Sequence, residues 1–136
     1  MTINNVENAV PQNQNNNSGQ GANSQVPEEV ANRFNWGVFT LSWIWGIGNN
    51  TYITFLFLAI TLIPGIGKYL GLITCVIFGK YGNKWAWQNK KWKSIEHFHK
   101  VQKTWACWGI GLMVVLISIS VLSVIAAILL SLSQAQ

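Results

Sequence analysis

The feature that most constrains the fold is the apolar run from Ala106 to Leu132. This run holds 27 residues without a charge, and no charged side chain follows Lys103. A helix needs about 20 apolar residues to cross a hydrocarbon core of about 30 Å. We therefore expect a C-terminal transmembrane helix in an integral membrane protein.

The composition of the whole chain points the same way. Half of the 136 residues are apolar and only 10% are charged, whereas about a quarter of the residues in a typical soluble domain are charged. A chain of this length forms one domain at most once a polar tail is set aside. The sequence therefore predicts an all-α fold, with a single membrane domain over residues 33–136.

The N-terminal segment has a different composition. Residues 1–32 are rich in Asn and Gln, hold no aromatic residue and carry few charges. Such a segment buries too little apolar surface to offset the entropy lost on ordering. We expect a disordered tail over residues 1–32, without the basic and apolar regions of a signal peptide.

The first aromatic segment reads FNWGVFTLSWIWGIGN and spans residues 34–49. Asn35 suits the N-cap of a helix, and Trp36, Trp43 and Trp45 follow it. Because indole rings favour the headgroup level of a bilayer, we expect a short tryptophan-rich helix at the membrane interface. The alternative is an ordinary helix packed on the bundle.

The next segment is apolar from Tyr52 to Phe78, with Lys68 as its one charge and a Pro-Gly-Ile-Gly break at residues 64–67. Pro64 removes a backbone donor, and the glycines permit a tight reversal. A hairpin of two short helices places Lys68 at its turn, whereas a single kinked span buries this charge at a cost of about 3 kcal/mol. We favour the hairpin, and the single span stays open.

Tryptophan and lysine alternate between Gly82 and Gly109. On a helical wheel that starts at Trp92, aromatic and aliphatic residues share one side and lysines the other, which predicts a basic amphipathic helix. The excess of lysine over residues 80–103 favours the cytoplasmic side of the membrane. The candidate residues for binding an anionic lipid membrane or a protein partner are Trp85, Trp87, Lys90, Lys91, Trp92, Lys93, Lys100, Lys103 and Trp105.

Catalytic chemistry finds little support in the sequence. His97 and His99 are two positions apart, so a helix points them in different directions, and the chain has no Asp and four acids in all. The sequence predicts no enzyme activity, no cofactor and no metal. It also predicts no specific nucleic-acid binding, because the aromatic side chains share the apolar side of the basic helix.

Two stretches carry a resemblance to a known family. The segments RFNWGVFTLSWIWGIGN and GKYGNKWAWQNKKWKSIEHFHKVQKTWACWG resemble those of a family of small uncharacterised bacterial membrane proteins. The shared pattern is close to F-N-W-G, W-I-W-G-x-G-N, G-N-x-W-A-W-x-N and E-x-F-x-x-V-Q-x-x-W. The resemblance covers about residues 33–111 and implies the architecture and a location in a bacterial inner membrane, but no site. Some members are labelled ribonuclease G.

These patterns favour a non-enzymatic interaction or scaffold subunit that docks its basic helix on an anionic leaflet. It would bind a protein partner or further copies of itself. The alternative is a small oligomeric pore or transport component, in which Pro64, Gly65, Gly67 and Lys68 form a hinge or ion path. RNA processing is a remote alternative, since the paired acids of metal-dependent hydrolysis are missing.

Overall fold

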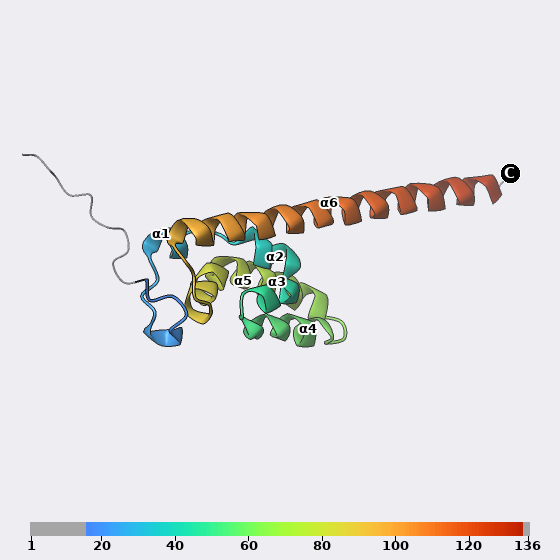
Figure 1. The fold of residues 1–136 in the computed structure, drawn as a ribbon. Coiled ribbons are helices and arrows are strands. Elements are labelled where there is room, and N and C mark those ends of the chain that lie inside the picture. Colours follow the sequence, from blue (N-terminus) through green and yellow to red (C-terminus); the bar gives the residue numbers. More distant parts are fainter. Residues whose placement is uncertain (1–15, 135–136) are drawn as a thin grey trace, which may run out of the picture.

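The computed structural model describes residues 16–134, and all regular secondary structure within this range is helical (Figure 1). Two of the α-helices, α5 and α6, are long, and the other four are short. A single-turn helix, η1, precedes them, and a second, η2, leads into α4. The elements are η1 (Gly21–Asn23), α1 (Glu28–Ala31), α2 (Trp36–Leu41), α3 (Trp43–Gly48), η2 (Tyr52–Phe55), α4 (Leu56–Thr61), α5 (Gly67–Asn89) and α6 (Ile95–Gln134).

Helix α6 is one unbroken helix of 40 residues. The sequence predicted two elements here, a basic amphipathic helix and a separate transmembrane helix, and this division is wrong. No proline interrupts the stretch, and Gly109 and Gly111 lie inside the helix without breaking it. Trp92 also lies outside α6, because the chain is irregular from Lys90 to Ser94.

The two halves of α6 have different surroundings. The first half packs on the other helices, chiefly α2, and the second half projects away from them (Figure 1). Every residue from Ile110 to Gln134 is exposed. At 1.5 Å per residue this run is about 37 Å long. Helix α6 is therefore long and apolar enough to cross a membrane.

A turn at residues 62–66 folds α4 back against α5. Gly65 takes a positive φ of 79°, a conformation that glycine adopts without strain. A Cβ atom on Gly71 would lie 2.7 Å from the Thr61 methyl group, so the absence of a side chain lets the helices approach. Helix α5 then continues past the apolar region to Asn89.

Helices α2 and α3 result from a break in the first tryptophan segment. The break is at Ser42, where φ is 41°. Asn35 is the N-cap of α2, as predicted, and its Oδ1 accepts a hydrogen bond of 3.0 Å from the backbone of Val38. Helix α2 lies against both α5 and α6. The bundle contacts account for its position, and the interfacial location remains a prediction.

The predicted disordered tail, residues 1–32, needs a correction. Residues 1–15 lie outside the described part of the chain, but residues 16–32 belong to the folded body. Val30 has no exposed surface and joins the core. The Gly19 amide donates to the Trp87 carbonyl at 2.9 Å, and Ser18 Oγ accepts from the Trp92 amide at 2.8 Å. Long-range backbone hydrogen bonds and one buried valine thus fix this polar segment.

Candidate functional site

The candidate tryptophans lie in or against the protein core. Trp87 and Trp92 are each 2% exposed, and Trp85 and Trp105 are partly buried against the same cluster. The Trp92 ring meets Phe98 edge-on, with 4.9 Å between the ring centroids, and its Nε1 donates to the Ala86 carbonyl at 2.9 Å. The proposed contact of Trp87 and Trp92 with lipid is therefore wrong, because the α5–α6 connection folds both rings inward.

The candidate lysines remain near the surface, and Lys91, Lys93, Lys100 and Lys103 are exposed. Lys90 is partly buried, where its Nζ donates to the Gly48 carbonyl at 2.8 Å and lies 5.0 Å from the centroid of the Trp92 ring. Lys91 donates to the Asn16 carbonyl. The two-sided pattern predicted from the wheel is thus present over the first part of α6, with its apolar side against the protein itself.

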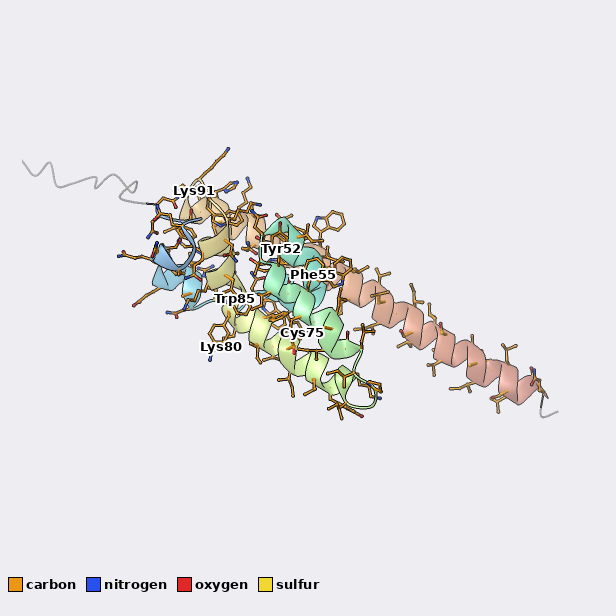
Figure 2. The ribbon with its side chains drawn as sticks, turned by 90° about the horizontal axis from the view of Figure 1, so that it is seen from below. Tyr52, Phe55, Cys75, Lys80, Trp85 and Lys91 are labelled. Carbon is orange, nitrogen blue, oxygen red and sulfur yellow. The ribbon has the colours of Figure 1, made fainter. Side chains whose placement is uncertain are left out.

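Figure 2 places the charged and apolar ends of the body. Lys91 lies at the end of the body opposite to the α4–α5 turn, and the free half of α6 extends toward the side of that turn. Pro64, Gly65 and Lys68 are exposed at the turn, whereas Gly67 is buried against the Ile60 and Thr61 carbonyls. The candidate hinge residues and Lys91 therefore lie at opposite ends of the body (Figure 2).

A network of buried amides joins four of the helices. Gln102 on α6 is its centre: Oε1 accepts from Asn35 Nδ2 at 3.0 Å and from Trp45 Nε1 at 2.8 Å, and Nε2 donates to Asn49 Oδ1 at 2.8 Å. Asn35 Nδ2 also donates to Asn83 Oδ1 at 2.6 Å. Burying such groups costs little when each is hydrogen-bonded. The network fixes α2, α3, α5 and α6 relative to one another.

This network was not predicted from the sequence, although each of its amide residues lies within one of the motifs that resemble the bacterial family. Asn35 belongs to F-N-W-G, Asn49 to W-I-W-G-x-G-N and Asn83 to G-N-x-W-A-W-x-N. Gln102 carried the available signal. It follows Phe98 by four residues and precedes Trp105 by three, which places an amide on the apolar side of the helical wheel. A polar residue on such a side needs a buried partner.

A groove opens beside the network, between α6 and the segment that leads into α2. Its volume is about 520 Å³. The amides of Asn35, Asn83 and Gln102 line it together with charged and aromatic side chains from both walls. The charged residues that line it are Arg33, Lys100, Lys103 and Glu96, three positive against one negative. The groove is therefore positively charged overall.

His99 also lines this groove, in the part of α6 that packs on the body. Burial lowers the pKa of His99 below its ordinary value, and the positive charge of Arg33 lowers it further against a smaller opposing effect of Glu29. The lowered pKa favours the neutral imidazole. The positive charge of the groove thus comes from Arg33, Lys100 and Lys103.

Metal ligands do not cluster in the described part of the chain: no group of three or more His, Cys, Asp or Glu side chains within residues 16–134 could hold a metal ion. Cys75 and Cys107 are free cysteines. The residues described here supply a charged surface, a groove and a rigid interior.

Comparisons with known proteins do not assign this chain to a family. No family model matches the chain, and neither the curated proteins nor the solved structures contain a match. The resemblance to small bacterial membrane proteins therefore stays a prediction that rests on its motifs.

Proposed function

We propose that this protein is a non-enzymatic interaction subunit, anchored in a membrane by α6, whose lysine-rich face binds the anionic cytoplasmic leaflet. The lysine-rich face consists of Lys90, Lys91, Lys93, Lys100 and Lys103. The observation that carries the proposal is the continuity of α6, because the same helix bears two of these lysines, Lys100 and Lys103, and the segment that enters the membrane.

The distribution of exposed side chains supports this placement. Leu62, at the α4–α5 turn, is 80% exposed, and Trp108 on α6 is 74% exposed. Exposed apolar surface of this extent is costly in water and favourable in lipid. The free half of α6 extends toward the side of the turn (Figure 2). Membrane insertion from that side leaves the lysines outside the hydrocarbon core, on the side from which the hairpin enters (Figure 2).

Helix α6 and the α4–α5 hairpin differ in length, and they therefore have different roles in the membrane. The exposed part of α6 exceeds a 30 Å core by a few ångströms, which a modest tilt accommodates. The apolar part of α5, from Gly67 to Phe78, is only about 18 Å long. The α4–α5 hairpin accordingly enters the bilayer from the cytoplasmic side and returns to it. This keeps the segment before the hairpin on the same side as the lysines.

The interior of the body suits a scaffold. Trp45, Trp87 and Phe98 are buried together, and the amide network fixes the helices that surround them. A protein partner or a second copy would meet a surface held in one arrangement, so binding would require little reordering.

The test uses the full-length protein reconstituted in vesicles of phosphatidylcholine, with or without phosphatidylglycerol. An environment-sensitive dye is attached to Ser94→Cys, at an exposed position beside the lysines, after Cys75 and Cys107 are replaced by alanine. We expect the dye to report a more apolar environment in the anionic vesicles. The difference should shrink in about 0.5 M salt, where charges are screened within a few ångströms.

Two matched variants separate charge from structure. Replacing Lys90, Lys91 and Lys93 with Gln should abolish the response to phosphatidylglycerol, and replacing the same three with Arg should retain it. Each lysine near an anionic surface contributes about 1 kcal/mol, so three substitutions exceed the threshold of detection. Equal dye emission in both kinds of vesicle would reject the proposed leaflet contact.

A further inference from the structure

We infer that the groove between α6 and the segment leading into α2 is a binding site for one anionic phospholipid. The phosphodiester would lie between Arg33, Lys100 and Lys103, and an acyl chain would pass Trp36 and Ala106. The inference deepens the proposed function and rests on it, since it assumes that the groove lies at the headgroup level.

The positive end of the groove fits a phosphodiester. Arg33 and Lys100 approach it from opposite walls, and Lys103 lies one turn further along α6. Guanidinium and ammonium groups are the side chains that bind phosphate oxygens most strongly. Glu96 is the single acid in the lining, so a monoanionic headgroup meets an excess of positive charge.

The other end of the groove is apolar and faces the membrane side. Trp36 is 49% exposed and lies 4.9 Å from Phe34 and 5.7 Å from Phe39, measured between ring centroids. Ala106 lies six positions beyond Lys100 on α6, about 9 Å further along the helix. A ligand that fills the groove thus needs a negative end and an apolar end in this order, as a phospholipid has.

The floor of the groove is rigid. Asn35, Asn83 and Gln102 form it, and their amide groups are already hydrogen-bonded to one another or to the backbone. The Arg33 carbonyl accepts from Asn83 Nδ2 at 2.8 Å, which holds the backbone of Arg33 against α5. The backbone position of Arg33 is therefore fixed against α5 before any ligand binds.

The same chemistry could bind a free phosphate ester, so the experiment separates the two sources. Purified full-length protein in a neutral detergent is titrated with dioctanoyl phosphatidylglycerol, dioctanoyl phosphatidylcholine and glycerol 3-phosphate, and bound molecules are counted by native mass spectrometry. We expect one phosphatidylglycerol to bind at least fivefold more tightly than either of the other two.

The groove variant combines Arg33→Gln with Lys103→Gln, and the matched control combines Lys80→Gln with Lys84→Gln, two exposed lysines on α5. The affinity for phosphatidylglycerol should fall roughly tenfold or more in the groove variant, because each basic residue near anionic headgroups contributes a factor of about five. It should change less than threefold in the control. Circular dichroism establishes that both variants keep the wild-type helix content.

Each other outcome overturns the inference in a recognisable way. Equal losses in the groove variant and the control would mean diffuse attraction to the surface, which removes the site and leaves the proposed function intact. Equal affinity for glycerol 3-phosphate and the lipid would assign the groove to a soluble anion. No preference for phosphatidylglycerol, together with an unresponsive dye at position 94, would reject both the site and the leaflet contact.

Discussion

Replacing Gln102 with Leu tests whether the buried amide network holds the helices together. The substitution keeps a side chain of similar size but removes both the acceptor of Trp45 Nε1 and the donor to Asn49 Oδ1. Trp45 and Asn49 have no exposed surface, so water does not replace the lost partners. Asn35 retains its hydrogen bonds to Asn83 at 2.6 Å and to the Val38 amide and loses only the one to Gln102.

The expected loss of stability comes from two buried groups that lose their hydrogen-bond partner, Trp45 Nε1 and Asn49 Oδ1. Each buried polar group without a partner costs about 1–3 kcal/mol, and the added apolar surface of leucine returns roughly 1 kcal/mol. We therefore expect Gln102→Leu to lower the free energy of unfolding by about 1–5 kcal/mol. The measurement is unfolding in mixed micelles at increasing dodecyl sulfate fraction, followed by near-ultraviolet circular dichroism of the buried tryptophans.

Two controls make the result specific. Thr104→Val changes an exposed residue on the same helix, whose hydroxyl bonds only the Lys100 carbonyl of its own helix, and should cost less than 1 kcal/mol. In a Trp45→Phe background the indole donor is already gone, so Gln102→Leu should cost about 1–3 kcal/mol less than in the wild type. A loss below 1 kcal/mol for Gln102→Leu alone would refute the reasoning.

Two further perturbations test the N-terminal segment and the pore alternative. Gly19→Ala places a Cβ 2.8 Å from the Lys91 backbone nitrogen at a φ of 79°, so this variant should be cleaved faster by a protease within residues 16–27. Gly21 has a φ of 63° and open space around it, so Gly21→Ala should lower the stability by only about 1 kcal/mol. Equal cleavage of the two variants would contradict the packing of Gly19. If copies of the chain form a pore, Lys68→Leu should abolish ion flux through reconstituted vesicles and Lys68→Arg should retain it, and flux unaffected by Lys68→Leu would reject that alternative.

The sequence predicts well the features that depend on local pattern. The charge-free run after Lys103 indicates the long apolar helix, because span length is a one-dimensional property. The N-cap at Asn35 depends on the next three residues alone. The proline and glycines at residues 64–67 indicate the reversal between α4 and α5 for the same reason.

The features that depend on distant contacts were not predictable in the same way. The segment at residues 16–32 lacks the composition of a folded region, and its order comes from Val30 and from hydrogen bonds to the α5–α6 connection. The burial of Trp87 and Trp92 depends on how α5 and the α5–α6 connection pack against Phe98 on α6, a contact that the local pattern does not encode. For the candidate site, the lysines were found from their charge, but the groove requires Arg33 to meet α6 across about 70 positions of sequence.

Because α6 is one unbroken helix, a tilt of its free half also tilts the half that packs on the body. A rod of 40 residues is about 60 Å long, and a change of about 10° in its tilt moves one end by roughly 10 Å relative to the other. Tilt is the usual response of a helix to bilayer thickness. Because the amide network couples α6 to α2, α3 and α5, the body turns with the rod. In the proposed membrane-spanning arrangement of α6, a thinner bilayer would reorient the whole lysine-bearing body, and membrane thickness would then set the orientation in which the body meets a partner.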